Sequence, residues 1–162
     1  MATFDEMILT HRLFMRGYPF SRYKINPMPC SPLTKPLSQA KIALITTAGL
    51  YQEGQNKFDS SIKLGDSSFR EISGSIDTQS LKEGHRSSAF DHRGVRDDKN
   101  LVLPLDRFRE MVADKEIGSL NHRHFSFMGS IIGPGDLISK TAPEMANLLK
   151  ADKVDVAFLT PV

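Results

Sequence analysis

Apolar residues along this chain fall in short, nearly continuous runs, and these runs predict the strands of a covered sheet. The first run, residues 41–47, reads Lys-Ile-Ala-Leu-Ile-Thr-Thr and carries apolar side chains on both faces. Two apolar faces are typical of an inner strand in a parallel sheet that helices cover on both sides. A second run, residues 154–159, predicts another buried strand shortly before Val162.

Three weaker segments also have the composition of strands, and one long polar segment does not. The three strand candidates are residues 69–72, 100–105 and 122–128. Residues 73–99 are polar and show little periodicity, so they predict a long loop.

Two segments between the predicted strands have helical spacing. The first follows Asp106, a residue type suited to capping a helix, and ends before Gly118. The second begins with the capping box Thr141-Ala142-Pro143-Glu144. The apolar residues on one side of these helices are Phe108, Met111 and Val112, and then Met145, Leu148 and Leu149. Alternating strands and helices predict an α/β fold with a mostly parallel sheet and flanking helices, as in an incomplete doubly wound domain.

The first 36 residues follow a different pattern, so we predict two parts, residues 1–36 and 37–162. The capping box Thr3-Phe4-Asp5-Glu6 predicts a short helix that stops at Gly17. Prolines then follow at positions 19, 27, 29, 32 and 36. Proline fixes φ and removes a hydrogen-bond donor, which predicts an extended, irregular arm. The arm either lies over the domain or docks a partner.

Composition and charge exclude several classes of protein. Hydrophobic residues make up 40% and charged residues 25% of the chain, which is typical of a globular protein. The net charge of +2 does not indicate a nucleic-acid partner, and no apolar run is long enough to span a membrane. The single cysteine, Cys30, fits a reducing compartment, and Asp5 and Glu6 are wrong for a signal peptide. We therefore expect a soluble, cytoplasmic protein.

Histidines and arginines gather in one part of the sequence. The histidines there are His85, His92, His122 and His124, with Asp91 and Asp106 nearby. Such groups transfer protons or bind a metal, but their spacing matches no zinc pattern, so we expect no metal site. The interleaved arginines are Arg86, Arg93, Arg96, Arg107 and Arg123. Guanidinium groups bind carboxylates through paired hydrogen bonds, so this region either holds an anionic substrate or pairs with its own aspartates.

Several stretches are distinctive in combination, because of their order and spacing. They are residues 41–50, 65–70, His85, 89–91, 100–107, 117–118, 124–129, 148–150 and 154–161. Together they resemble the selenoprotein B family of glycine, sarcosine, betaine and D-proline reductases, and in particular its short D-proline-reductase-like members. The resemblance covers most of residues 37–162.

The resemblance implies an oxidoreductase that cleaves a carbon–nitrogen bond reductively in a small amino-acid-like substrate. In such systems a selenocysteine, or a cysteine, attacks the α-carbon and displaces nitrogen. In the better-known complexes a pyruvoyl group on a partner subunit activates the amine, and a thioredoxin-like or other dithiol reductant supplies the electrons. Within this setting we predict that His85, Asp91 and His124 transfer protons or stabilise the thiolate. Arg86 and Arg123 are the predicted substrate-binding residues.

The family places its selenocysteine or cysteine directly after the last strand, followed by proline and a second cysteine. The printed sequence has neither residue there, since it stops at Val162. We expect a chain truncated at an in-frame UGA codon and inactive alone in carbon–nitrogen reduction. The resemblance therefore implies no cofactor within this chain. It implies a selenocysteine just past Val162 and a possible pyruvoyl group on a partner subunit.

Two other functions remain open from the residues. The first is a non-catalytic α/β binding or assembly module. The second is a metal-dependent enzyme that uses the region from His85 to His124. The sequence leaves the substrate, the oligomeric state and the physiological reductant undetermined.

Overall fold

The computed structural model describes residues 8–17, 31–88 and 90–162. The chain divides into two compact units, residues 1–32 and 33–162. In the first unit, helix α1 spans Leu9–Gly17 and ends at the predicted glycine. The capping box at residues 3–6 and most of the proline-rich arm lie outside the described residues. No helix in the described ranges is both long and apolar enough to cross a bilayer.

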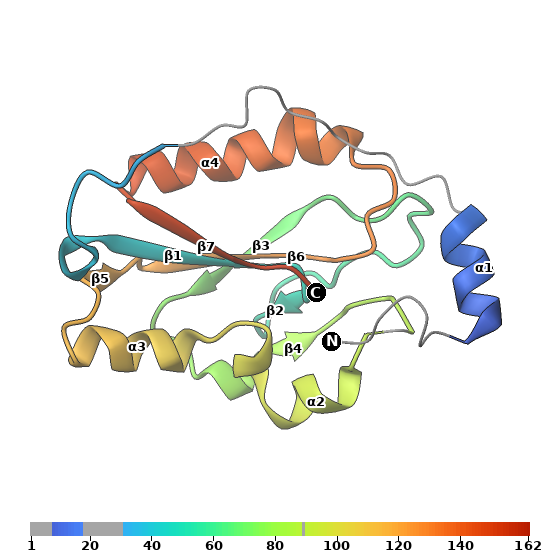
Figure 1. Ribbon diagram of the computed structural model, residues 1–162, viewed down its shortest axis with the longest axis horizontal. Helices are drawn as coiled ribbons and strands as arrows, with labels where there is room; N and C mark the ends of the chain where they lie inside the picture. The colour runs from blue at the N-terminus through green and yellow to red at the C-terminus, as the bar shows by residue number, and fades with distance from the viewer. Residues whose placement is uncertain (1–7, 18–30, 89) are drawn as a thin grey trace. The chain divides into compact units, whose positions relative to one another are not determined.

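The second unit is a mixed sheet with helices on both faces (Figure 1). Strand β1, Lys41–Thr46, pairs in parallel with β7 along one edge, and with β5 and then β6 along the other. Strand β3 is antiparallel to β6. The bounds are β3 Phe69–Ser73, β5 Ser119–Leu120, β6 Arg123–Phe127 and β7 Val156–Thr160. The predicted α/β class, with a mostly parallel sheet and flanking helices, is confirmed.

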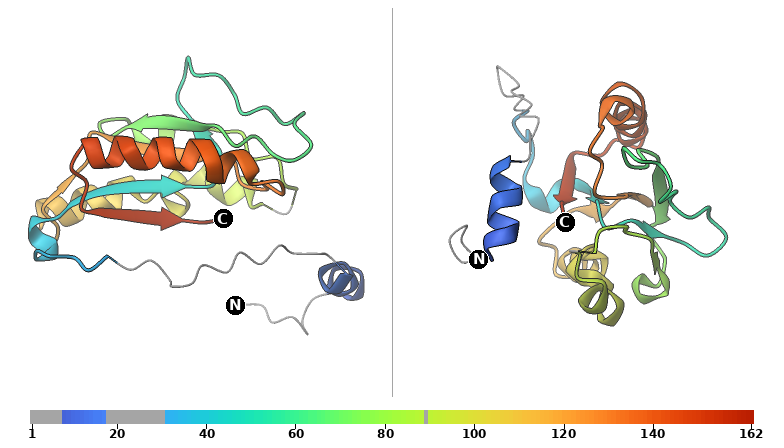
Figure 2. Two further views of the ribbon diagram at one scale, coloured as in Figure 1. Left: turned by 90° about the horizontal axis from the view of Figure 1, so that it is seen from above. Right: turned by 90° about the vertical axis from the view of Figure 1, so that its right-hand side faces the viewer.

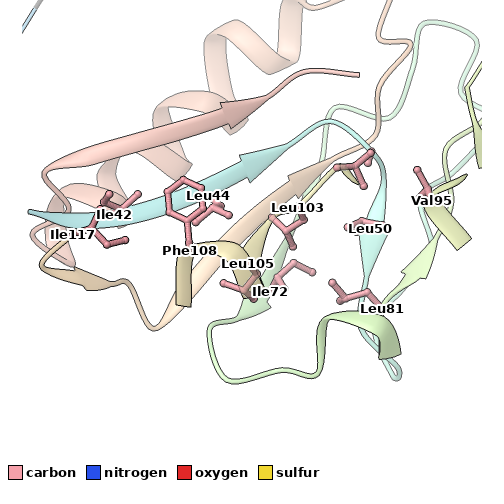
Figure 3. Close-up of a cluster of buried hydrophobic side chains, with 12 residues drawn as sticks. Ile42, Leu44, Leu50, Ile72, Leu81, Val95, Leu103, Leu105, Phe108 and Ile117 are labelled. Carbon is pink, nitrogen blue, oxygen red and sulfur yellow. The ribbon is translucent and has the colours of Figure 1, made fainter. Parts of the chain in front are cut away.

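Alternate side chains of β1 serve two separate apolar clusters, because successive residues of a strand point to opposite faces. Ile42 and Leu44 pack in the cluster on the side of α3 (Figure 3). Ala43 and Ile45 pack in the cluster on the side of α4. The helices are α3, Leu105–Ala113, and α4, Ala142–Ala151, and they lie on opposite faces of the sheet (Figures 1 and 2). Both faces of β1 are therefore covered, as its apolar sequence predicts.

The segment predicted as a long loop, residues 73–99, contains short regular elements instead. Within it, strand β4 spans Lys82–Glu83 and helix α2 spans His92–Asp97. Strand β4 pairs in antiparallel fashion with β2, Leu50–Tyr51, which precedes this segment. Shorter helical turns complete the unit at Leu37–Gln39, Thr78–Ser80, Lys99–Leu101 and Leu137–Thr141. These elements are too short to produce a periodic signal in the sequence.

The predicted strand at residues 100–105 is wrong. A helical turn ends at Leu101, and α3 begins at Leu105. Side chains satisfy the local backbone here: Asn100 N donates to Asp98 Oδ1 at 2.8 Å, and Asp106 N donates to Asn100 Oδ1 at 3.0 Å. Such side-chain bonds offer the backbone an alternative to a sheet ladder. The predicted capping role of Asp106 is also wrong, since Asp106 lies inside the first turn of α3.

Two further details differ from the predictions. Thr141 makes no capping bond, because the chain is already helical from Leu137 and the Thr141 hydroxyl donates to Ser67 O at 2.8 Å. Strand β7 exists as predicted, but it is not buried: the exposed fraction of Leu159 is 62%. Pairing of β7 is seen only with β1 among the described residues, so one edge of β7 is open in this part of the chain.

A buried histidine joins β1 to β6 where the pairing passes from β5 to β6. Asn121 N donates to Ile42 O at 2.8 Å, and Leu44 N then donates to Nδ1 of His124 at 3.0 Å. His124 is fully buried, and this burial lowers its pKa to about 4. The imidazole is therefore neutral at pH 7, which leaves Nδ1 able to accept the Leu44 bond.

We predict that the free energy of unfolding falls as the pH is lowered from about 6.5 to about 4. In this range the unfolded chain takes up a proton on His124 and the folded chain does not, so the folded state loses stability. The pKa difference corresponds to a loss of about 3 kcal/mol. Urea denaturation across this pH range measures the effect.

The matched control is His122, which lies two residues away and is exposed. His124→Gln is expected to give a shallower pH dependence than the wild type, and His122→Gln the same dependence as the wild type. Equal slopes for the two variants would rule out His124 as the source.

Candidate functional site

A cavity of about 390 Å³ lies at the carboxyl ends of the parallel strands. Ser130, shortly after β6, and Val162, shortly after β7, both line it. The apolar lining residues are Phe90, Val95, Leu101, Val102 and Val162, and the polar ones are His85, Ser87, Asp91 and Ser130. Ligands of open α/β sheets bind at this end of the strands, so the cavity is the candidate functional site.

His85 is the buried polar group of this cavity. Its ring stacks on Phe90 with centroids 4.3 Å apart, and Nδ1 accepts a hydrogen bond from Ser87 N at 3.2 Å. Burial lowers the pKa of His85, so the ring is neutral near pH 7 and carries its proton on Nε2. Nε2 is buried without a hydrogen-bond partner among the described residues. Nε2 therefore packs against the backbone at Gly129 and has its donor capacity unused in this part of the chain.

Gly129 makes room for the His85 ring. A Cβ atom at position 129 would overlap Nε2 of His85 and lie 2.9 Å from Thr47 O. The close approach of the ring to the backbone after β6 therefore requires a glycine. Residues 124–129 carried part of the sequence resemblance, but nothing in the sequence pointed to a contact between Gly129 and His85.

Asp91 lies at the cavity and also caps helix α2. Its Oδ1 accepts a hydrogen bond from Gly94 N at 2.9 Å. This cap fixes the carboxylate at the amino terminus of a short helix, beside the apolar wall that includes Val95. The structure thus brings together two of the three predicted catalytic residues, His85 and Asp91.

The third predicted catalytic residue, His124, lies inside the sheet and does not line the cavity. Its Nδ1 is bonded to Leu44 N, as described above. This geometry supports a structural contact, and a catalytic role for His124 stays a prediction.

The two predicted substrate-binding arginines lie in different places. Arg86 is near the cavity, and its guanidinium donates to Ile62 O at 2.6 Å and to Ser130 O at 3.1 Å. Arg123 begins β6 at the opposite end of the sheet and makes a two-bond contact with Asp152, at 2.7 and 2.8 Å. The hydrogen bonds from Arg123 lower the pKa of Asp152 to about 2. A substrate contact of either arginine stays a prediction.

The geometry gives no support to the alternative of a metal-dependent enzyme. His85 and His92 have ring centroids 6.5 Å apart, whereas His122 and His124 belong to the β6 region. Within residues 8–17, 31–88 and 90–162, no group of three His, Cys, Asp or Glu residues is placed to hold a metal ion.

Sequence reasoning missed Glu83, which joins both histidines of this region. Glu83 Oε1 accepts a hydrogen bond from His85 N, and Oε2 lies 2.8 Å from Nδ1 of His92. Glu83 is nine residues from His92 and belongs to a strand of two residues, so no local spacing signal pointed to it.

Comparisons with known proteins agree with the resemblance seen in the sequence. The family described as glycine/sarcosine/betaine reductase selenoprotein B matches residues 8–162. The D-proline reductase subunit gamma of Acetoanaerobium sticklandii is 33% identical over 140 residues, which are 84% of this chain and 54% of that protein. The glycine reductase complex component B subunit gamma of Carboxydothermus hydrogenoformans is 30% identical over 136 residues, 82% of this chain and 30% of that protein.

The chain thus spans about half, or less, of the length of these relatives. No solved structure matches it.

We predict that Gly129→Ala displaces the His85 ring and lowers the free energy of unfolding by about 1–3 kcal/mol, because the added methyl group overpacks a closed site. Urea denaturation measures the loss, and the NMR signals of the His85 ring report the displacement. Gly135→Ala is the control, since nothing lies within 4 Å of a Cβ there. Equal stability of the two variants, with an unmoved His85 signal, would contradict this packing.

Proposed function

Because this chain belongs to the glycine/sarcosine/betaine reductase selenoprotein B family, we propose that it forms part of the active site of a reductive enzyme. Its relatives are named as subunits of reductases, which supports a role within a complex of several subunits. The substrate class proposed is a small amino-acid-like molecule, as the relatives' names suggest.

One observation carries the proposal: the cavity with His85 and Asp91 lies where β7 ends, and Val162 is part of its wall. In the family that the sequence resembles, a selenocysteine or cysteine directly follows the last strand. A residue at that position would stand beside the cavity. We therefore propose that the redox residue lies beyond Val162, next to the site that this chain builds.

The cavity suits such a group on physical grounds. His85 is a neutral imidazole of the cavity wall, and its Nε2 proton, which has no partner among the described residues, is the proposed donor to an anionic selenolate or thiolate. The cavity wall also contains the buried apolar residues Val95 and Val102, and a low local dielectric strengthens a charge-assisted hydrogen bond.

A selenolate or thiolate held beside His85 and Ser130 would supply a nucleophile for displacement of the amine, and a dithiol would supply the two electrons of the net reduction. A pyruvoyl group on a partner subunit is the proposed activator of the amine. In this proposal, the residues of this chain bind the substrate and orient it toward the nucleophile. The Asp91 carboxylate attracts a positively charged amine, and His85 holds a proton close to the nucleophile. Arg86, beside Ser130, is the arginine nearer to the cavity and the proposed contact for a substrate carboxylate.

The position of the redox residue is tested by the coding DNA. We expect the reading frame that encodes β7 to encode a selenocysteine or cysteine next to this strand, followed by a Pro-x-Cys motif. A reading frame that encodes neither residue next to β7 would contradict it.

The roles of the cavity residues are tested in the reductase assembled from the extended chain, its partner subunits and a dithiol. Asp91→Asn is expected to lower kcat/KM for the amine substrate about 100-fold. Asparagine keeps the cap to Gly94 N but removes the charge. The measurement is dithiol-dependent release of the amine.

Asp97→Asn is the matched control, because Asp97 is exposed near the end of the same helix α2. Its activity should equal that of the wild type. An assembled wild type without any dithiol-dependent reduction would instead favour the binding or assembly module.

A further inference from the structure

The two ring nitrogens of His92 both face hydrogen-bond acceptors. Nδ1 lies 2.8 Å from the carboxylate Oε2 of Glu83, and Nε2 lies 2.9 Å from the backbone carbonyl oxygen of Ser87. A neutral imidazole carries one N–H and donates a single hydrogen bond. Both contacts are satisfied together only when the ring is an imidazolium that donates from each nitrogen.

These two contacts connect the ends of the segment 83–92, and this segment includes residues that form one wall of the cavity. Ser87, Phe90 and Asp91 all line the cavity and lie between Glu83 and His92 in sequence. The His92 ring therefore joins strand β4, which contains Glu83, to the backbone of the wall itself.

The contacts also reach His85. Glu83 uses one carboxylate oxygen for His92 and the other for the backbone N–H of His85. Phe90 lies between the two imidazoles, stacked on His85 with centroids 4.3 Å apart and edge-on to His92 with centroids 5.1 Å apart. Loss of the His92 contacts would therefore loosen both the cavity wall and the contacts that hold His85 in place.

We infer that His92, in its protonated form, is a positioning residue that holds the cavity wall in place and that its deprotonation loosens this wall. The inference rests on the proposed function only for the identity of the cavity as the substrate site. The geometric part, a doubly bonded imidazolium, stands independently of any activity.

Charged groups around His92 agree with this state. The hydrogen bond to Glu83, followed by that to the Ser87 carbonyl, raises the pKa of His92 above its usual value. Arg96, one turn along α2, acts in the opposite direction, and His85 is held neutral by burial. Since the pKa is raised in the folded state, the contacts are complete at low pH and are lost as the pH rises through the raised pKa.

The inference is tested in the full chain by NMR of the histidine rings and by hydrogen exchange. At pH 6 we expect both His92 ring nitrogens to carry protons, with a titration midpoint above the usual value for a histidine. Glu83→Gln removes the charged acceptor and should lower the His92 midpoint. A His92 ring with a single N–H at pH 6 would overturn the inference.

Hydrogen exchange, corrected for the intrinsic pH dependence of the rates, separates positioning from general stability. The Ser87 and Phe90 amides are hydrogen-bonded to His85 Nδ1 and to Ser87 O, and their protection should fall about tenfold or more as the pH rises through the His92 midpoint. In His92→Gln the protection of these amides should be low at every pH. His122→Gln is the control and should behave as the wild type.

Protection that does not change across the His92 titration would also overturn the inference. Neither readout uses activity, so this outcome leaves the proposed reductase function standing. Conversely, an inactive enzyme with the expected pH-dependent protection would contradict the proposed function alone.

Discussion

The structure depends on β1 being hydrogen-bonded along both edges and covered on both faces. Strand β7 pairs with one edge of β1 along the full length of β7. The other edge of β1 pairs first with β5 and then with β6. The bond from Leu44 N to the buried His124 ring bridges this change of partner, so a side chain completes the ladder that the backbone leaves open. A buried N–H without a partner costs free energy, which explains a neutral imidazole in the middle of an apolar sheet.

The candidate site follows from that sheet. Because β1, β6 and β7 run in parallel, their carboxyl ends meet at one edge, and the chain after β6 and after β7 contributes Ser130 and Val162 to the cavity. The remaining wall comes from residues 85–102, which fold back over the same edge. Gly129 allows the His85 ring to approach the backbone after β6, and this contact fastens the wall to the sheet.

Charges in this unit are divided between two ends of the sheet. Arg123, Asp152 and Glu71 form a hydrogen-bonded group where β6 begins, which is the end opposite to the cavity. At the cavity end, the Glu83 carboxylate links His85 and His92. The first group stabilises the packing of α4 against the sheet, whereas the second controls the shape of a cavity. Because the chain belongs to the selenoprotein B family, the second group, which borders the cavity, is the one that bears on the proposed reductase function.

The α/β class, the strands β1, β3, β6 and β7, and the occurrence of His85 and Asp91 in one region could be predicted from the sequence. These features depend on local apolar runs and on residue order, which a linear pattern contains. The positions of His124 and Arg123 away from the cavity could not be predicted, because their partners Leu44 and Asp152 are distant in sequence and meet them only in the folded sheet. The same holds for the contacts of Glu83 with His92 and of Gly129 with His85, which arise where separate segments fold together and leave no periodic signal.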